Sequence, residues 1–316
     1  MSSPSPDEIE APVTRVVQDR FEACIYRPGQ VARCPARVPE ERLTAEQLDL
    51  LLEEGDQRVG STVFRTECPF CTACEPVRID VPAFQRTRSQ ERVWRRNQDL
   101  VVEIGPPTLD RTHVRLWNRH RRARGLMTEH SRRDPVGYSE WLVETCAPTV
   151  EFRYRVQGRL AAVSILDLGR VSANSAYCYF DPAESARSLG VYSVLHEVDW
   201  CRRMGMRWYY LGLWVRDCSA LRYKTNYLPH ERYVRRAWVR FETVAQVEAP
   251  SQDRVEHDEL LEGDDSADDA PGADSDDSLS LLFPEGDPDT LPADAPFTDR
   301  TEEATRPTVP ADPTRR

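Results

Sequence analysis

The chain has 316 residues, with 42 basic side chains, 53 acidic side chains and nine cysteines. This length allows one or two domains with a core that needs no disulfides. The first ten residues are polar and acidic, without the apolar stretch of a signal peptide, and no run of 18 apolar residues occurs. We therefore expect a cytoplasmic protein whose thiols stay reduced, rather than a secreted or membrane-spanning one.

The acidic residues are concentrated at the C-terminus. Residues 245–316 hold 21 acidic and 5 basic side chains, a net charge of −16, whereas the preceding residues hold 32 acidic and 37 basic ones, a net charge of +5. The tail is rich in Pro, Ala and Ser and offers too little apolar surface to offset the entropy of ordering it. We predict that residues 1–14 and 245–316 are disordered. The mildly basic remainder is compatible with RNA binding.

Residues 15–147 are predicted to form an N-terminal region of helices and short strands around a cysteine-rich turn. Thr44 is followed three residues later by Gln47, which is the signal of a capping box at the start of a helix. The hydrophobic pattern predicts helices over 43–55, 89–99 and 113–124, and strands at 63–64 and 77–81.

Residues 148–244 are predicted to form a C-terminal region with an α+β fold. The pattern predicts strands over 152–156, 160–168 and 175–180, then a helix over 191–204 and a strand over 208–212. This order is typical of a GNAT-like acyltransferase fold, in which backbone N–H groups at a helix N-terminus receive the polar end of an acyl donor. Arg187 and Gly190 lie where that donor loop is expected, although an ordinary helix entry explains them equally well.

Residues 68–74 read CPFCTAC and place three thiols within seven residues. Such spacing supplies three of the four ligands that a tetrahedral zinc ion or an iron–sulfur cluster requires. Upstream, Cys24 and Cys34 are the available fourth ligands. A redox pair and a buried cysteine-rich turn are the alternatives.

Seven short blocks occur in one order along the chain, namely residues 24–29, 68–78, 88–99, 180–182, 188–192, 209–212 and 223–229. In this order they resemble the aminoacyl-tRNA–protein transferases, the group of the arginyltransferases and the bacterial aspartate/glutamate leucyltransferases. The resemblance covers residues 15–243. Arg27 stands where many bacterial members have Leu, and Cys34 is an additional cysteine.

The resemblance implies an activity and its partners. The enzyme would move leucine, or alternatively arginine, from aminoacyl-tRNA to the N-terminus of proteins that begin with Asp or Glu, which then enter N-end-rule degradation. Neither DNA nor a membrane is an expected partner, and the chemistry itself would need no cofactor. At the possible zinc or iron–sulfur site, the implied ligands are Cys24, Cys68, Cys71 and Cys74.

The reaction sets requirements on further residues. An acidic acceptor needs a fixed cation, and the candidates for acceptor binding are Arg78, Tyr223, Lys224 and Tyr227. A basic helix face would hold tRNA phosphates, which favours Arg88, Arg92, Arg95 and Arg96. No Ser-His-Asp spacing is visible, so we expect direct attack by the amine rather than a covalent acyl-enzyme. The sequence does not identify a catalytic residue. Asp181, Glu197 and Asp217 are the candidates for the proton acceptor, although a helix cap or a surface carboxylate explains each of them better.

The sequence also leads to expectations for the histidines and to two other possible classes of protein. His113, His120 and His130 lie in Arg-rich helical sequence and are expected to be at least partly exposed, whereas His196 is expected in the core. A metal-stabilised RNA-binding module without catalysis would also combine a cysteine cluster with a basic helix. An acetyl-CoA-dependent GNAT enzyme is disfavoured because residues 187–190 hold a single glycine.

Overall fold

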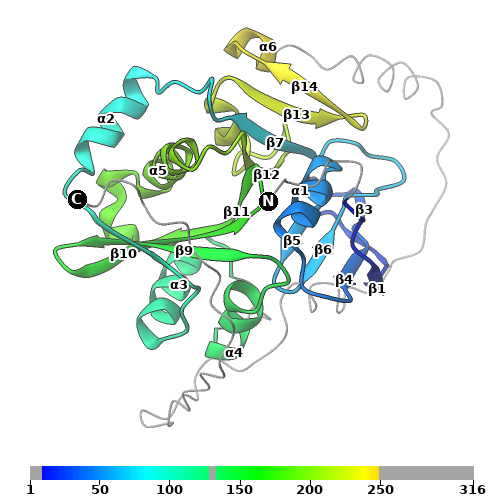
Figure 1. The fold of residues 1–316 in the computed structure, drawn as a ribbon, viewed down its shortest axis with the longest axis horizontal. Coiled ribbons are helices and arrows are strands. Elements are labelled where there is room, and N and C mark those ends of the chain that lie inside the picture. The colour runs from blue at the N-terminus through cyan, green and yellow to red at the C-terminus, as the bar shows by residue number, and fades with distance from the viewer. Residues whose placement is uncertain (1–8, 128–132, 249–316) are drawn as a thin grey trace.

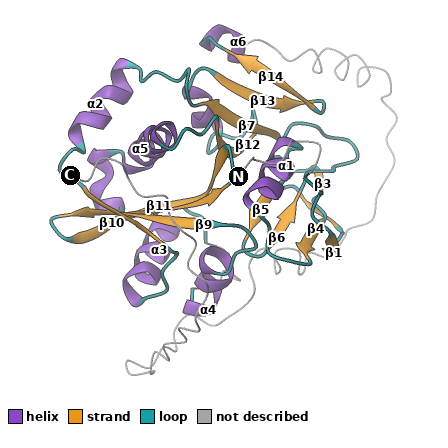
Figure 2. Cartoon of the chain, in the orientation of Figure 1, coloured by secondary structure: helices purple, strands orange, loops and turns teal. Residues whose placement is uncertain are grey.

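An eight-stranded sheet forms the centre of the protein (Figures 1 and 2). The computed structural model describes residues 9–127 and 133–248. The strand order is β14-β13-β7-β12-β11-β10-β9-β8, and only the β11–β12 pair is parallel. The strands are β7 (Glu75–Asp80), β8 (Val101–Gly105), β9 (Thr149–Val156), β10 (Arg159–Leu168), β11 (Ser172–Phe180), β12 (Trp208–Trp214), β13 (His230–Val234) and β14 (Ala237–Phe241).

Helices cover both faces of this sheet (Figure 1). On one face α5 packs against β11 and β12, and α2 packs on α5; on the other face α3 packs against β10 and β11. Two apolar cores result, one between the sheet and α5, the other between the sheet and α3 with the segment that follows it. The helices are α2 (Arg88–Arg96), α3 (Arg111–Ala123), α4 (Pro135–Tyr138), the π-helical η2 (Ser139–Val143) and α5 (Leu189–Arg203).

A smaller sheet and one helix precede the large sheet. The smaller sheet has the order β1-β4-β6-β5, and a separate hairpin pairs β2 with β3. Helix α1 (Ala45–Glu53) begins with the predicted capping box, in which Thr44 and Gln47 each bond the other's backbone N–H. The strands are β1 (Thr14–Gln18), β2 (Phe21–Ala23), β3 (Val31–Arg33), β4 (Ala36–Pro39), β5 (Gln57–Val59) and β6 (Thr62–Phe64).

The predicted helices and strands are confirmed within a few residues of their predicted ends, whereas β1–β5, β8, β13 and β14 were not predicted. The large sheet crosses the predicted boundary between residues 147 and 148, because β7 and β8 lie on its N-terminal side. β1 starts inside the segment predicted as disordered at 1–14. A short helix, α6 (Val244–Glu248), also crosses the predicted start of the tail at residue 245. Residues 249–316, where the rest of the acidic tail lies, are outside the described residues.

The feature of the fold that positions the site is the divergence of β11 and β12. These strands pair only through residues 172–174 and 208–210. Beyond that point β11 continues against β10, and β12 continues against β7. Gly212 lies at the irregularity in β12 with a φ of 71°, a conformation that favours glycine. No helix among the described residues is long and apolar enough to cross a membrane.

Candidate active site

Glu197 is the most unusual ionisable group beside the β11–β12 divergence. It projects from α5 into the core and is fully buried. Its carboxylate accepts hydrogen bonds from the hydroxyls of Tyr209, at 2.5 Å, and Tyr154, at 3.1 Å. Burial raises the pKa of Glu197 to about 7, against the opposing effect of hydrogen bonds from Tyr209, Ser164 and Tyr154. A carboxyl group with this pKa exchanges its proton near neutral pH, as a general acid or base requires.

Two further groups, the thiol of Cys178 and the hydroxyl of Ser193, lie next to Glu197. Cys178 of β11 is 3.4 Å from the hydroxyl of Ser193, which lies one helical turn before Glu197 on α5. Burial raises the pKa of Cys178 to about 12, and the charge of Glu197 adds to the rise. Because a thiol with this pKa stays protonated at neutral pH, Cys178 is poorly suited to act as a nucleophile.

The two other predicted proton acceptors are held in ion pairs. Asp181 is 2.8 Å from the guanidinium of Arg119 and 2.6 Å from that of Arg159. These partners and a backbone N–H outweigh burial and lower the pKa of Asp181. Asp217 is exposed and lies 3.8 Å from Arg27. Unlike Asp181, Glu197 has a pKa close to neutral.

Lys224 lies beside Gly212 and Leu213 of β12, the strand that diverges from β11. It belongs to the short 3-10 helix η4 (Arg222–Asn226) and is 8% exposed. Its ammonium group donates to the carbonyl of Leu213 at 2.7 Å. Burial lowers the pKa of Lys224 to about 8, with Cys218 opposing the change. Lys224 is therefore a buried donor beside the divergence rather than an exposed cation.

The two predicted tyrosines flank Lys224 in sequence but differ in exposure. Tyr223 is 44% exposed, whereas Tyr227 is 2% exposed. Burial raises the pKa of Tyr227, and Tyr223, Glu197 and Cys178 raise it further through their charges. The structure therefore brings η4 and the Glu197 cluster together.

Arg78 projects from the face of the sheet that packs on α1, whereas its neighbours Val77 and Ile79 belong to the core beneath α5. Its guanidinium bonds Glu53 and bonds Glu231 at 2.8 Å, and it stacks between Trp208 and Trp238 at 3.9 Å and 4.0 Å from their ring centroids. It is 5% exposed. Two carboxylates already occupy this cation, so its position favours a structural role over acceptor binding.

The predicted donor loop is tied to α2. The guanidinium of Arg187 forms two bonds of 2.8 Å with the carboxylate of Asp99, which follows α2. Asn97 at the end of α2 donates to the backbone carbonyl of Arg187 at 2.8 Å. A side chain at Gly190 would place its Cβ 3.0 Å from the ring of Phe180, so this position favours glycine.

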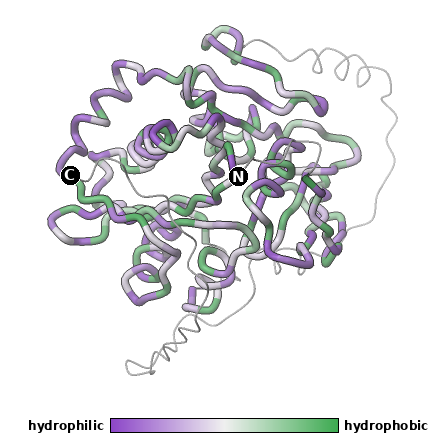
Figure 3. The backbone as a smooth tube through the Cα atoms, in the orientation of Figure 1, coloured by the Kyte–Doolittle hydropathy of each residue, from purple (hydrophilic) through white to green (hydrophobic). Residues whose placement is uncertain are grey.

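The predicted tRNA-binding arginines lie along the exposed side of α2, which is hydrophilic along most of its length (Figure 3). Arg95 is 3.1 Å from Glu91, and Arg96 bonds the carbonyl of Ala186. Arg86 lies before the helix and stacks on Trp94 at 4.1 Å. The exposed arginines on the helix are Arg88, Arg92, Arg95 and Arg96.

The five cysteines of the N-terminal region lie near one another. Burial raises the pKa of Cys74 to about 12, and the charges of Cys68, Cys24, Cys71 and Cys34 add to the rise. Within the described ranges, however, no three His, Cys, Asp or Glu side chains are arranged to hold one metal ion. The arrangement does not fit a ready ligand set, and the zinc or iron–sulfur site stays a prediction.

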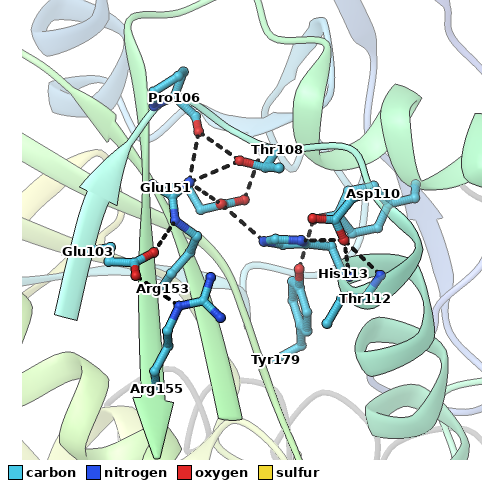
Figure 4. Close-up of polar contacts among 11 residues, drawn as sticks. Glu103, Pro106, Thr108, Asp110, Thr112, His113, Glu151, Arg153, Arg155 and Tyr179 are labelled. Atoms are coloured by element: carbon cyan, nitrogen blue, oxygen red, sulfur yellow. Dashed lines mark hydrogen bonds and ion pairs between the residues drawn. The ribbon is translucent and has the colours of Figure 1, made fainter. Parts of the chain in front are cut away.

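A second buried polar cluster lies at the start of α3 (Figure 4). The imidazole of His113 lies between the carboxylates of Asp110, at 2.9 Å, and Glu151, at 3.3 Å. Arg153 is 3.0 Å from Glu151. Burial lowers the pKa of His113, but Glu151 and then Asp110 outweigh it, and the pKa is raised. This cluster joins the loop before α3 to β9.

The histidine predictions were partly wrong. His113 is 2% exposed and His120 is 5% exposed, so neither is a surface residue. The burial has a physical basis, since both lie on the side of α3 that packs on the sheet. His196 is half-buried among the rings of Trp94, Tyr192 and Tyr154. His130 lies outside the described residues.

The sequence did not single out Tyr154, Cys178 or Ser193, and Tyr209 stood out only as part of the block at 209–212. Ser193 and Glu197 are four residues apart on one helix, which places them on the same face. That spacing was a usable signal. The two tyrosines come from β9 and β12, and only the register of the sheet brings them to Glu197.

Comparisons with known proteins agree over most of the described chain. A family model for the N-terminus of arginine-tRNA-protein transferases matches residues 22–92, and one for their C-terminus matches residues 112–234. The chain is 32% identical over 216 residues to an aspartate/glutamate leucyltransferase of Hahella chejuensis, covering 68% of this chain and 92% of the relative. It is 34% identical over 220 residues to the corresponding protein of Halorhodospira halophila, with the same coverage of 68% and 92%.

Among solved structures, the C-terminal domain of a putative lysylphosphatidylglycerol synthetase from Agrobacterium fabrum has a TM-score of 0.36 and 14% identity, over 45% of this chain and 47% of that one.

The family is shown by the two leucyltransferases. Both share at least 30% identity with this chain, and the match covers more than nine-tenths of their length. The chain belongs to the aminoacyl-tRNA–protein transferase family.

Proposed function

We propose that this protein transfers leucine from Leu-tRNA to the N-terminal amine of proteins that begin with Asp or Glu, using a GNAT-like acyltransferase fold. The observation that carries the proposal is its identity of more than 30% to aspartate/glutamate leucyltransferases over 92% of their length. The product would enter N-end-rule degradation in the cytoplasm.

The proposed reaction is aminolysis of an ester. The amine nitrogen of the acceptor attacks the carbonyl carbon of the aminoacyl ester, a C–N bond forms, and the ester C–O bond breaks. The terminal ribose of the tRNA leaves as an alcohol, while the nitrogen loses a proton. The ester is already activated, so positioning of both substrates and handling of that proton are the main tasks of the protein.

The β11–α5–β12 unit is the proposed acyl-donor site. In GNAT-like folds the donor lies where two parallel strands separate beside a helix N-terminus, and β11 and β12 separate next to α5 in this way. Lys224 adds a buried N–H donor beside β12. A donor at this place stabilises negative charge that develops on an ester oxygen.

Glu197 is the proposed proton acceptor. Its pKa of about 7 suits the transfer of a proton between an amine and a leaving alcohol. It is fully buried, so the proton would pass through the hydroxyl of Tyr209 or Tyr154, each of which is hydrogen-bonded to it. Each hydroxyl can donate its proton to Glu197 while it receives another from the substrate.

The exposed face of α2 is the proposed tRNA contact. Its arginines present positive charge toward solvent, which suits contacts to phosphate. The link from Arg187 to Asp99 fixes the end of this helix relative to the start of α5. A tRNA held on α2 would thereby be positioned relative to the donor site.

No cofactor takes part in the proposed chemistry. The cysteine-rich turn at residues 68–74 follows β6 and immediately precedes Glu75, the first residue of β7. Its proposed task is to shape the segment that leads into β7.

The test is a transfer assay with purified protein, a peptide that begins with Glu, and tRNA charged with labelled leucine or labelled arginine. Transfer of leucine to the peptide is expected. Preferential transfer of arginine would favour the alternative donor, which the description of the matching family models names. Binding of tRNA without transfer of either label would favour the non-catalytic RNA-binding module.

A further inference from the structure

We propose that Arg232 and Trp214 form the subsite that binds the carboxylate of the acidic first residue of the acceptor. This inference rests on the proposed function and names the residues that select the acceptor. Both side chains lie on adjoining parts of the sheet, Arg232 on β13 and Trp214 at the end of β12. They are 4% and 3% exposed, respectively.

The guanidinium of Arg232 is held in a fixed position. It lies 4.4 Å from the ring centroid of Trp214 and 3.7 Å from that of Phe241, so that it is clamped between two aromatic rings. One of its terminal nitrogens is 3.0 Å from a carboxylate oxygen of Glu75. The two rings and Glu75 fix the orientation of the guanidinium. They leave at least one of its N–H donors, Nε, without a hydrogen bond among the described residues.

Two buried donors in this place have no hydrogen-bond partner among the described residues, namely Nε of Arg232 and Nε1 of Trp214. Oε2 of Glu75 also forms no hydrogen bond there, and it faces a terminal nitrogen of Arg232 as an ion pair rather than facing either of these two donors. A buried donor without a partner costs about 1–3 kcal/mol, so a site that contains two of them favours an acceptor-rich ligand. A carboxylate offers two oxygens, and Arg binds carboxylates through paired N–H groups.

A second guanidinium adds positive charge near the site. Arg216 lies 5.5 Å from the ring of the same tryptophan, and its charge reaches both Glu75 and Arg232. Burial lowers the pKa of Arg232, Glu75 opposes this, and Arg216 lowers it further. A negatively charged ligand at Arg232 would be favoured by this nearby positive charge.

Arg78 provides the contrast on the other face of the sheet. It too is buried and clamped between two rings, but Glu53 and Glu231 supply two carboxylates to its one guanidinium. No nitrogen of Arg78 is among the buried groups without a partner in the described chain. Of these two buried arginines, Arg232 is the one that has capacity for a carboxylate ligand.

The position of the subsite agrees with the proposed reaction. Arg232 and Trp214 lie on the α5 side of the sheet, and Trp214 belongs to the same apolar core as Tyr209 and Tyr227. His230, two residues before Arg232, contacts the carbonyl of Tyr227 at 3.3 Å through Nδ1. The side chain of Glu75 is 14% exposed and marks the side from which an acceptor would enter.

The test compares peptides that begin with Glu and with Gln, which differ in charge but hardly in shape. Wild-type protein and the variants Arg232→Gln, Arg232→Lys and Trp214→Phe are assayed for kcat and KM with each peptide and for KM with Leu-tRNA. We expect Arg232→Gln to raise KM for the Glu peptide about 10- to 100-fold, the range expected for one hydrogen bond to a charged group. The preference for Glu over Gln should shrink by the same factor while KM for Leu-tRNA stays unchanged. Arg232→Lys should restore part of the preference.

Trp214→Phe keeps an aromatic ring on Arg232 and removes only the N–H donor, so it serves where Arg232→Gln does not fold. We expect it to raise KM for the Glu peptide several-fold, in line with the loss of a single hydrogen bond. Arg78→Lys is the matched control on the other face and should lower Tm without changing the preference. An unchanged Glu/Gln preference in folded Arg232→Gln or in Trp214→Phe would overturn the subsite. A wild-type protein that transfers no amino acid would overturn the proposed function itself.

Discussion

The hydroxyl of Tyr209 donates a 2.5 Å hydrogen bond to the carboxylate of Glu197, and neither residue is exposed to solvent. A buried carboxyl group with a pKa of about 7 is costly to keep in a core and is typical of sites that move protons. The hydrogen bond connects this group to β12, the strand that diverges from β11. This relationship is the basis for assigning proton transfer to Glu197.

Glu197→Gln should lower kcat by about 10²- to 10⁴-fold, the usual contribution of a general base. In the wild-type protein the rate should rise with pH through about 7, as Glu197 loses its proton, and the variant should lose this limb. The measurement is a pH–rate profile at saturating Leu-tRNA. Asp217→Asn removes an exposed carboxylate and should keep the wild-type profile. A Glu197→Gln profile that keeps the rise near 7 would assign the proton to another group.

Glu197 should also make the folded protein less stable as the pH rises. Between pH 4.5 and about 7 the folded state holds a proton on Glu197 that the unfolded chain has released, so the free energy of unfolding falls across this window. A pKa rise of this size corresponds to about 3 kcal/mol. Urea denaturation at pH 5 and pH 7.5 should show a smaller difference for Glu197→Gln than for wild type. The raised pKa of His113 also makes stability depend on pH, but it does so equally in wild type and in Glu197→Gln. Its contribution therefore cancels when the two proteins are compared.

Arg78→Ala should destabilise the fold by about 3 kcal/mol or more, because it leaves Glu231 with only the more distant Arg240, at 3.9 Å, and empties the space between two indole rings. Urea denaturation measures the change. Arg88→Ala, at an exposed position on α2, should stay within about 0.5 kcal/mol of wild type. Equal stability of the two variants would show that the Arg78 cluster is not structural.

Arg78 and Arg232 show what could and could not be predicted from the sequence about the buried arginines. The motif around residues 68–78 drew attention to β7, and the need for a cation led to the prediction of an arginine. However, the side of the sheet to which Arg78 projects depends on the register of β7 with β12 and β13, which a single sequence does not fix. Arg232 lies on β13, a strand that was not predicted, so Arg232 was not considered as a candidate.

The same reasoning explains Glu197. Its place on a helix was predictable from hydrophobic periodicity, and its distance of four residues from Ser193 placed both on one face. Its hydrogen bonds to Tyr154 and Tyr209 join three elements that are far apart in the sequence. Local patterns predict helices and hairpins well, because these depend on neighbouring residues, whereas contacts among distant strands depend on the assembled sheet.

Removing positive charge from α2 should weaken tRNA binding and reduce its salt dependence. For Arg88→Gln/Arg92→Gln, the slope of log affinity against log salt should become shallower by about 1.5, from the loss of two phosphate contacts. Filter binding of Leu-tRNA at several salt concentrations measures this slope. Arg170→Gln is the control, because that arginine lies in the turn between β10 and β11, at the opposite end of these strands from Arg187. An unchanged slope in the double variant would place the tRNA elsewhere.

Truncations of the C-terminus should distinguish the contribution of α6 from that of the residues that follow it. A chain that ends after Glu248 keeps α6 and should transfer leucine at the wild-type rate. A chain that ends after Thr243 loses the buried Val247, whose carbonyl accepts a 3.5 Å bond from Arg216, and should be less stable by about 1–3 kcal/mol. Thermal unfolding and the transfer rate of both chains test this. Loss of activity in the longer chain would assign a catalytic role to residues 249–316.

The most direct test of the account is identification of the reaction product. Purified protein is incubated with Leu-tRNA and with two peptides that differ only in a first residue of Glu or Gln, and the products are sequenced from their N-termini by mass spectrometry. The account predicts one leucine added ahead of Glu and little or none ahead of Gln. No added leucine on the Glu peptide, or equal addition to both peptides, would contradict it.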